Sequence, residues 1–597
     1  MVRNLTAAKK YLLPGWMIQV SESKTQSTRL IATETVGLAL LMGLLVWAFP
    51  PDVNEAHYLA KALHFWDRDF CSNDIFVTSH ESHWFFYLTH GWLCLFLSFE
   101  TVAWVGRVAA WLVTAWGLVL LSRCFDHRLA VSCLVGCLVV TLNEYLNLAG
   151  EWFAGGVEGK CYAYGFAFAA LAMWFRQRWH IAWVLGGLAC AFHILVGLWC
   201  VVACSIAFVV SKFVKRDSDQ VRTNRVDDST GLAAKICLLV LGLGLFAAGF
   251  IPALSGLIDG GEQAGIAPSE IQALGRLSHH QFASEFTSWH LFLPLVLAWI
   301  LLWRFNQNVS NQNASDRNLQ SVRSLRQLNL LVLGSMMIAL AGLFCSLVVS
   351  TVAEGVLRDF CVRVLTFYLF RLADVLVPLG CVINGLVFVN RLPRTLNLAG
   401  SAGFVCVCIV AASIGFNCQQ NFVDARSGSA RQAARTPQTA EQLKREIEAE
   451  RNWIKTCQWI RENTPAQARF ITPYNQQTFK WHARRAEVAN RKDMPQDGRS
   501  VIKWSGQLAL LYEGTVRQPI GELSAGDSNQ SIDVGFLPLG FREHLKAVAE
   551  HLSADYLVVE QRLVDEFVLY YRLPECLEQI YPETGQRKST YVVFRFQ

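Results

Sequence analysis

Two acidic residues, Asp52 and Glu55, follow directly after the first long apolar run of the chain, at about residues 31–49. Their spacing of three places both carboxylates on one face if the segment is helical. A carboxylate at a membrane boundary stays in reach of water, and there it can accept a proton from a hydroxyl group. The alternative is that these acids simply end a transmembrane helix on its outer side. Asp52 and Glu55 are therefore candidate catalytic bases.

Further polar residues gather in four segments that separate apolar runs. Lysine, arginine and histidine beside carboxylates could neutralise a phosphate that leaves during a transfer reaction. The arginine fork in particular matches phosphate geometry. The substrate- or phosphate-binding candidates in these segments are His57, Glu158, Lys160, Arg276, His279, His280, Arg363 and Arg371.

Two of these candidates leave alternatives open. Arg371 needs an anionic partner near a membrane boundary, which is either Asp374 in a structural bridge or a lipid phosphate. The adjacent His279 and His280 point apart on a helix and on a strand, so the pair is poorly suited to chelate a metal. One of them can instead donate to a phosphate or shuttle a proton. No metal site is assigned, although a divalent ion remains compatible with the sequence.

The composition is that of a membrane protein joined to a soluble part, with 53% hydrophobic and only 17% charged residues among 597. Most of the 18 cysteines lie inside apolar runs, and no pair has zinc or redox spacing. Eleven apolar runs have spanning or near-spanning length, at about 31–49, 103–122, 129–148, 161–175, 180–193, 194–211, 233–257, 289–303, 328–350, 373–390 and 397–416.

The distribution of basic residues sets the expected topology. If the aromatic segment His83 to Phe99 lies along the bilayer surface, the Lys- and Arg-rich loops all fall on one side. The positive-inside rule then puts the N-terminus in the cytoplasm and the C-terminus outside, which we expect to be across the inner (plasma) membrane of a bacterium. The run around His193 is expected to form two short helices that meet at the outer side.

The predicted fold is an α-helical polytopic membrane protein of about eleven transmembrane helices, with a small C-terminal α/β extracytoplasmic domain. Its parts are a cytoplasmic N-terminal segment (1–30), a transmembrane domain (31–416), a linker (417–440) and the α/β domain (441–597). The outer loops that could carry catalysis are 51–102, 149–160, 258–289 and 351–373. The C-terminal domain has no glycine-rich phosphate loop or nucleophile elbow, so it is expected to be accessory, as a binding lid or a structural cap.

This layout resembles the GT-C class of polytopic glycosyltransferases, which use polyprenyl-phosphate-linked sugars. The shared features are the acidic residues after the first span, the aromatic segment that follows, and Arg107 at the start of the next span. The resemblance implies that Asp52 or Glu55 is the base and adds Arg107 to the substrate-binding candidates. The C-terminal part resembles an uncharacterised bacterial membrane protein family in the stretches 459–465, 470–473 and 492–495.

The expected function is that of a membrane glycosyltransferase of the cell envelope. It would transfer a sugar from a polyprenyl-phosphate-linked donor to an unknown acceptor at the outer side. Its partners would be the lipid-linked donor and membrane lipids, and not nucleic acid. Two alternatives remain: a membrane transporter or flippase, and a non-catalytic membrane protein with an exported binding domain.

Overall fold

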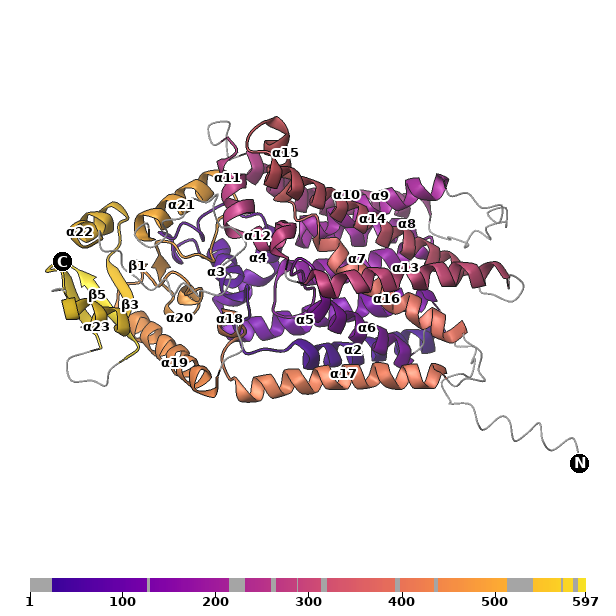
Figure 1. Ribbon diagram of the computed structural model, residues 1–597, viewed down its shortest axis with the longest axis horizontal. Coiled ribbons are helices and arrows are strands. Elements are labelled where there is room, and N and C mark those ends of the chain that lie inside the picture. Colours follow the sequence, from indigo (N-terminus) through magenta and orange to yellow (C-terminus); the bar gives the residue numbers. More distant parts are fainter. Residues whose placement is uncertain are drawn as a thin grey trace, which may run out of the picture.

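The computed structural model describes residues 24–125, 129–213, 231–258, 265–286, 288–312, 319–391, 398–433, 439–512, 541–570, 573–582 and 589–597. Most of the expected N-terminal segment, residues 1–23, lies outside this part, as do portions of the loops 212–235, 258–289 and 391–397. The chain forms a bundle of long helices with an α/β domain at one end (Figure 1).

Helices follow all eleven apolar runs predicted from the sequence. They are α2 (Lys24–Val46), α5 (Phe99–Ser122), α6 (Leu129–Leu146), α7 (Gly159–Phe175), α8 (Trp179–Phe192), α9 (Ile194–Phe213), α10 (Leu232–Ile258), α13 (Trp289–Gln312), α14 (Leu319–Thr351), α16 (Arg371–Arg391) and α17 (Leu398–Val423). Among the described residues, eight helices are long and apolar enough to cross a membrane, and α6, α7 and α8 are shorter. The expectation of a polytopic helical membrane protein is confirmed.

Two ambiguous segments take the expected form. The aromatic stretch before α5 folds into α4 (Trp84–His90) and the 3-10 helix η2 (Gly91–Leu95), which are too short to cross a bilayer. Next to η2, Phe96 exposes 78% of its surface, which suits a segment resting in the membrane interface. The run around His193 is divided at that residue, which has an extended backbone between α8 and α9.

A buried amide cluster joins three membrane helices. Asn384 of α16 donates to Asn329 Oδ1 of α14 at 2.9 Å, and Asn306 of α13 donates to the Asn384 carbonyl at 3.0 Å. Trp299 Nε1 also donates to Asn329 Oδ1, at 2.8 Å. Such side-chain hydrogen bonds fix helix contacts where no hydrophobic driving force exists between helices and lipid.

The C-terminal domain contains a five-stranded sheet covered by helices on both faces. Strand order is β2-β1-β3-β5-β4; β1 is parallel to β2 and β3, whereas β5 is antiparallel to β3 and β4. The strands are β1 (Arg469–Ile471), β2 (Ala486–Glu487), β3 (Tyr556–Glu560), β4 (Leu577–Tyr581) and β5 (Tyr591–Phe596). The helices are α19 (Ala440–Asn463), α20 (Phe479–Ala483), α21 (Gly498–Tyr512), α22 (Phe541–His551) and α23 (Gln561–Tyr570).

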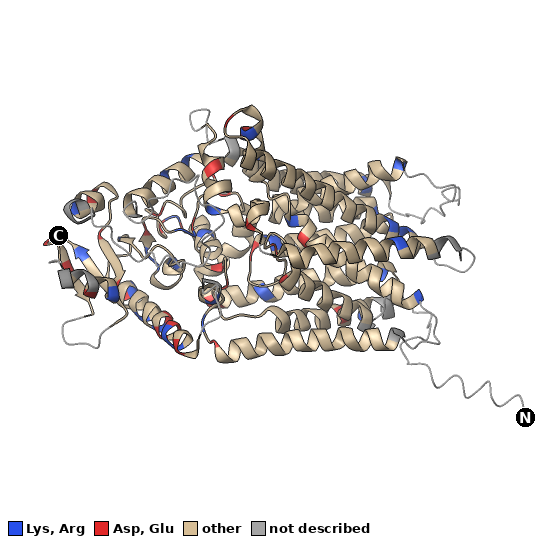
Figure 2. Cartoon of the chain, in the orientation of Figure 1, with Lys and Arg blue, Asp and Glu red and all other residues tan. Residues whose placement is uncertain are grey.

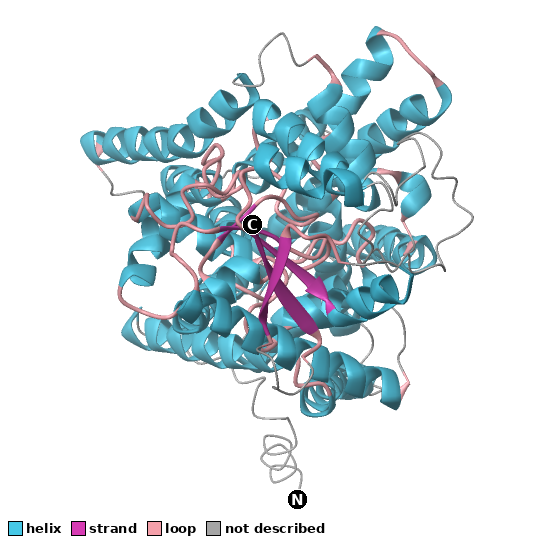
Figure 3. Cartoon of the chain, turned by 90° about the vertical axis from the view of Figure 1, so that its left-hand side faces the viewer, coloured by secondary structure: helices cyan, strands magenta, loops and turns pink. Residues whose placement is uncertain are grey.

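The period-2 alternation of the strands builds the two cores of this domain. Val558 and Val593 point to the face covered by α19, together with Trp453. Leu557 and Val592 point to the opposite face, which α21, α22 and α23 cover. Viewed along the bundle, the sheet lies over the end of the membrane helices (Figure 3).

The segment that joins the two parts is more ordered than the linker predicted at 417–440. Helix α17 continues to Val423, and α18 (Gly428–Ala433) follows after four residues. Phe49 and Ser427 form an isolated parallel bridge, so the segment runs beside the acidic loop that follows α2.

The first outer loop is also part of the interface with the C-terminal domain. It contains α3 (Glu55–Trp66), and beyond it Ile75 enters the core beneath α21 and α22. Asp74 lies 3.1 Å from Lys480 Nζ of α20, which also pairs with Glu487 and Asp493. All four of these side chains are buried, so the two parts of the chain share a polar core as well as an apolar one.

Charges are divided between the two ends of the bundle. In Figure 2, ribbon segments coloured blue for Lys and Arg lie at the helix ends far from the sheet domain. In the sequence, these ends carry Arg123, Arg176, Arg178, Lys212 and Arg391. The acidic loop, the second outer loop and the C-terminal domain lie together at the other end, where carboxylates are mixed with cations.

Candidate functional site

The carboxylate of Glu55 is held by a bidentate ion pair. Arg107 of α5 donates through Nε to Oε1 and through Nη2 to Oε2, both at 2.6 Å, and each side chain is 1% exposed. The backbone N–H groups of Val157 and Asp52 also donate to these two oxygens, at 2.7 Å each. Both oxygens are therefore occupied, and Glu55 fixes the acidic loop to α5 and to the second outer loop.

Asp52 lies beside this pair without an ion-pair partner among the described residues. Its Oδ1 accepts only the N–H of Val53, at 2.9 Å. Burial raises the pKa of Asp52 above its ordinary value, and the charge of Glu55 raises this pKa further, whereas Arg107 and Arg431 lower it. A carboxylate with a raised pKa and an available oxygen is suited to accept a proton.

The start of α18 covers Asp52. Gly428 N donates to the Phe49 carbonyl at 2.9 Å, and Ser429 Oγ donates to the Asp52 carbonyl at 3.0 Å. A Cβ atom added at Gly428 would lie 2.2 Å from Asp52 Oδ1 and 3.0 Å from its Cα. The site thus requires a residue without a side chain at this point of the C-terminal segment.

Replacing Gly428 by alanine should displace the Asp52 carboxylate. Because a misplacement of about 1 Å can reduce turnover on the order of 10²-fold, we expect a loss of that size in any activity that uses Asp52. Gly415→Ala is the matched control, since an added Cβ meets nothing within 4 Å there. Equal activity of both variants would show that Asp52 has no role that depends on its position.

The second outer loop, between α6 and α7, brings opposite charges together. Asn54 Nδ2 donates to Glu158 Oε1 at 3.1 Å, which joins this loop to the acidic loop. Lys160 Nζ lies 3.6 Å from Glu158 and 3.8 Å from Glu151, and Glu151 lies 3.1 Å from Arg371 Nε. A continuous row of charged side chains therefore connects the acidic loop with the start of α16.

This loop is held by side chains from two helices, α16 and α6. The Asp374 carboxylate accepts the N–H groups of Leu148, Ala149 and Glu151, at 2.8, 2.9 and 3.2 Å. Asn143 Nδ2 of α6 donates to the Glu151 carbonyl at 2.8 Å. Asp374 is thus occupied by backbone groups, and the Arg371–Asp374 bridge considered from the sequence is not formed because Glu151 is the partner of Arg371.

Arg371 has an environment that the sequence did not reveal. Its Nη1 lies 3.1 Å from His193 Nε2, and its guanidinium carbon lies 4.5 Å from the centre of the Tyr368 ring. Tyr368 has a φ of 54°, in the left-handed region that a bulky residue rarely adopts. Among the described residues, Arg371 Nε makes no hydrogen bond, although it lies 3.1 Å from Glu151 Oε2.

Four aromatic residues lie at the site although they were not among the predicted site residues: Tyr58, His83, Trp152 and His193. Lys160 Nζ lies 3.8 Å above the Trp152 ring, which shields the ammonium on one side. The rings of His83 and His193 are 5.0 Å apart, and His83 neighbours Tyr58 at 5.4 Å. No local signal distinguishes these aromatic residues from those of the membrane core, since only the tertiary fold brings them to Lys160 and Arg371.

The remaining predicted residues are found at different places. His57 lies 3.8 Å from Asp493, and Arg276 Nε donates to the Arg491 carbonyl at 2.8 Å, so both face the C-terminal domain. His280 Nδ1 lies 2.5 Å from the Ala149 carbonyl, and its ring is 4.1 Å from that of His279, so both are at the second outer loop. Arg363 is exposed on α15 (Val356–Leu365) and is not part of the cluster.

The carboxylates present do not fit a divalent cation. Glu55 is occupied by Arg107, and Glu151 and Glu158 face Lys160. Within the described ranges, no three His, Cys, Asp or Glu side chains come together in an arrangement that could hold a metal ion.

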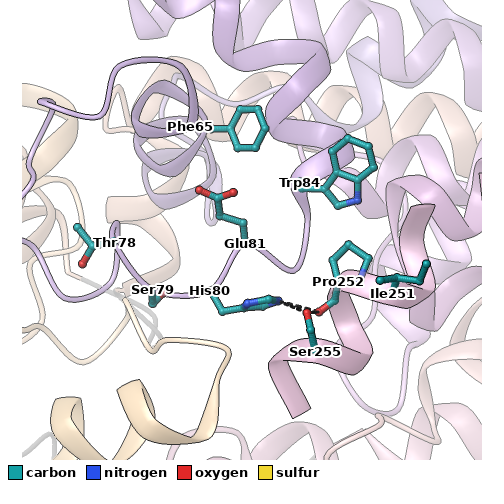
Figure 4. Close-up of a pocket in the computed structure, with 9 residues that line it drawn as sticks. All are labelled: Phe65, Thr78, Ser79, His80, Glu81, Trp84, Ile251, Pro252 and Ser255. Carbon is teal, nitrogen blue, oxygen red and sulfur yellow. Dashed lines mark hydrogen bonds between the residues drawn. The ribbon is translucent and has the colours of Figure 1, made fainter. Parts of the chain in front are cut away.

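A pocket of about 500 Å³ opens nearby, between the segment 78–84 and α10. Figure 4 shows its lining, in which the His80 ring points toward Ser255 and Pro252, while Glu81 and Trp84 lie across from them. Glu81 is paired with Arg68 at 2.5 Å. None of the predicted site residues lines this pocket.

One family model matches a part of the C-terminal domain. Residues 451–510 match a family described as a domain of unknown function (DUF6798), in agreement with the resemblance of the C-terminal part to an uncharacterised family. The comparison with curated proteins gave no match.

Three solved structures are similar to the chain over most of its length. An Archaeoglobus fulgidus oligosaccharyltransferase tethered with an acceptor peptide is 11% identical, with a TM-score of 0.43, over 89% of this chain and 69% of that one. The same enzyme in its apo form is 12% identical, with a TM-score of 0.36, over 90% and 70%. ArnT from Cupriavidus metallidurans bound to undecaprenyl phosphate is 12% identical, with a TM-score of 0.42, over 96% and 98%.

These matches agree with the predicted resemblance to GT-C glycosyltransferases in the layout of the chain.

Proposed function

We propose that the chain is an integral membrane glycosyltransferase whose donor is a sugar linked to a polyprenyl phosphate. The observation that supports this most is the row of polar and charged side chains from Asn54 through Glu158, Lys160 and Glu151 to Arg371. It lies next to Asp52, whose carboxylate has no ion-pair partner among the described residues. A base and cations from distant parts of the chain thus meet at one end of a membrane bundle. Such a position lets a lipid-anchored donor reach them from the bilayer. We further propose that this end faces the outside.

In the proposed reaction, Asp52 takes the proton of an acceptor hydroxyl group as the acceptor oxygen forms a bond to the anomeric carbon of the sugar. The bond between that carbon and the phosphate oxygen breaks, and its electron pair remains on the polyprenyl phosphate. Lys160, Arg371 and Arg276 stabilise the negative charge that develops there. Glu151 and Glu158 hold the first two cations in place before the donor arrives.

Glu55 and Arg107 position this machinery and do not take part in bond breaking. Their ion pair fixes the loop that carries Asp52, and through Val157 N it fixes the second outer loop to the same point. Because both Glu55 oxygens are already engaged, proton transfer by Glu55 would require breaking a buried ion pair.

The acidic limb of the pH profile of kcat/KM should reflect the pKa of Asp52. Because burial and Glu55 raise the pKa of Asp52, the base form is lost as the pH falls through a value above the ordinary pKa of about 3.9. Removing the Arg431 charge by Arg431→Gln should raise this pKa further and move the acidic limb of the kcat/KM profile to higher pH. An unchanged limb would contradict the assignment of Asp52 as the base.

The function can be tested with the protein reconstituted in liposomes and a panel of undecaprenyl-phosphate-linked sugars. With an envelope extract as the acceptor source, the wild-type protein should release undecaprenyl phosphate from at least one donor. Arg371→Gln should reduce this release about tenfold or more, since it removes a charge-assisted contact to the leaving phosphate. Arg363→Gln is the control, since it alters an exposed arginine outside the cluster.

Two outcomes of this assay would overturn the proposal: no release from any donor, or equal release by the two variants. A transporter would move the lipid across the bilayer without breaking a bond. Release of the lipid phosphate therefore separates the enzyme from this alternative.

A further inference from the structure

A loop of the C-terminal domain, residues 490–493, is fixed against the membrane part. The Asn490 side chain accepts the N–H groups of Lys492 and Asp493 through Oδ1, both at 2.8 Å. Trp504 Nε1 donates to the Asn490 carbonyl at 2.9 Å, and Asp493 pairs with the buried Lys480 at 2.6 Å. The backbone of this loop is thus set by contacts on both sides of Lys492.

The same loop binds the membrane part through its neighbours on either side of Lys492. Arg276 donates to the carbonyl of Arg491, and the ring of His57 lies 3.8 Å from Asp493. Lys492 therefore lies between two contacts with residues from two different outer loops. Its side chain is partly buried, and no ion pair or hydrogen bond of its ammonium group occurs within the described ranges.

Two cations are thereby held near each other without a neutralising carboxylate contact. Arg276 donates a hydrogen bond from Nε to the Arg491 carbonyl, and it makes no ion pair in the part of the chain that is described. Burial lowers the pKa of Lys492 to about 8, and the positive charges of Arg276 and Lys160 contribute to this decrease. The negative charges of Glu158 and Asp493 oppose it. Like charges that a fold brings together in this way are stabilised by an anion between them.

We propose that Lys492 of the C-terminal domain binds the phosphate of the lipid-linked donor together with Arg276, so that the C-terminal domain completes the site. This inference rests on the proposed function and adds to it a residue from the part that the sequence suggested to be accessory. Closure of the site then depends on the contact between the loop 490–493 and the outer loops of the membrane part.

Binding to the full-length protein in detergent tests this role. Undecaprenyl phosphate is titrated into the wild type, Lys492→Ala, Lys492→Arg and the control Lys503→Ala, which alters an exposed lysine of α21. We expect Lys492→Ala to weaken binding about tenfold, with Lys492→Arg close to the wild type and Lys503→Ala unchanged. Inorganic phosphate as competitor distinguishes a general anion site, which it would occupy at equal affinity, from one that requires the lipid.

A second readout is the pH dependence of affinity. Raising the pH from 7 to 9 should weaken binding to the wild type as Lys492 loses its proton, and this weakening should be absent in Lys492→Arg. The titratable and charged groups that face Lys492 are His57, Glu158, Lys160, Arg276 and Asp493. Only the Lys492→Arg comparison separates the contribution of Lys492 from theirs.

The outcomes separate the two proposals. If Arg371→Gln weakens binding and Lys492→Ala does not, the role of Lys492 is refuted and the proposed function stands. Equal binding of inorganic phosphate would likewise refute the lipid donor as the ligand of Lys492. If the wild type binds no undecaprenyl phosphate, both proposals fail.

Discussion

Replacing Arg107 by leucine should destabilise the protein more than any other single change at the site. The substitution leaves the Glu55 carboxylate 1% exposed, without its counter-charge, at the boundary of a membrane bundle. Breaking a buried ion pair in this way costs about 3–5 kcal/mol. We expect a lower unfolding temperature in detergent micelles and a reduced yield of folded protein, measured by thermal unfolding and size-exclusion chromatography.

The double variant Glu55→Gln/Arg107→Leu tests whether the unpaired Glu55 charge causes the loss of stability in Arg107→Leu. It removes the stranded charge and keeps one amide oxygen, which can accept the N–H of Val157 or that of Asp52, so part of the lost stability should return. Arg68→Leu is the control, since it breaks the more exposed Arg68–Glu81 pair and should cost about 1 kcal/mol or less. If the double variant were as unstable as Arg107→Leu, the ion pair would not be the source of the effect.

Asp52→Asn should abolish most of the transfer activity without unfolding the protein. The amide cannot accept the acceptor proton, and general-base catalysis contributes about 10²–10⁴-fold to the rate. Within the described residues, this side chain accepts one hydrogen bond, from Val53 N to Oδ1, and the amide oxygen can keep it. We therefore expect kcat for release of undecaprenyl phosphate to fall by that factor, with KM and the unfolding temperature close to those of the wild type.

Asp69→Asn provides the matched control, since Asp69 is an exposed carboxylate of the same outer loop. Its activity should equal that of the wild type. Wild-type turnover in Asp52→Asn would rule out Asp52 as the base.

The membrane helices could be predicted from the sequence because their signal is local. A run of apolar residues must satisfy its backbone hydrogen bonds within itself, so each run folds as a helix whatever its neighbours are. The division of the long apolar run at His193 could also be predicted, because a polar residue near the middle of the run is a local signal as well. In the C-terminal domain, the short β-like runs at residues 469–472, 556–560 and 591–596 indicate strands by the same kind of local signal, and β1, β3 and β5 form there.

The two strands that were missed lack such a pattern. Strand β2 has only two residues, Ala486–Glu487, and owes its existence to pairing with β1. Strand β4, Leu577–Tyr581, lies at the sheet edge and is half exposed, so it mixes polar and apolar residues.

The distinction between Asp52 and Glu55 could not come from the sequence. Both acids follow the first span and are three residues apart, so either could be the base and either could be a structural partner. What separates them is Arg107, which lies 52 positions after Glu55 and occupies its carboxylate on both oxygens. Glu151 as a partner of Arg371 was missed for a similar reason, because only the fold brings it near, whereas Asp374, one of the two partners considered, is close in sequence.

The C-terminal domain was expected to be accessory because it carries no known phosphate-binding motif. The structure brings the chain after the membrane helices into direct contact with the site: Gly428 of the segment 417–440 covers Asp52, and the carbonyl of Arg491 in the C-terminal domain accepts a hydrogen bond from Arg276. These contacts link residues that are more than 200 positions apart, so no local pattern records them.

The affinity of the wild-type protein for undecaprenyl phosphate, compared with that for undecaprenol, tests the central claim most directly. The two lipids share the same chain and differ only in the charged group that Lys160, Arg276 and Arg371 are proposed to bind. We predict a dissociation constant for the phosphate that is about tenfold lower or more, as expected from at least one charge-assisted contact. Equal dissociation constants would contradict a phosphate site at this end of the bundle.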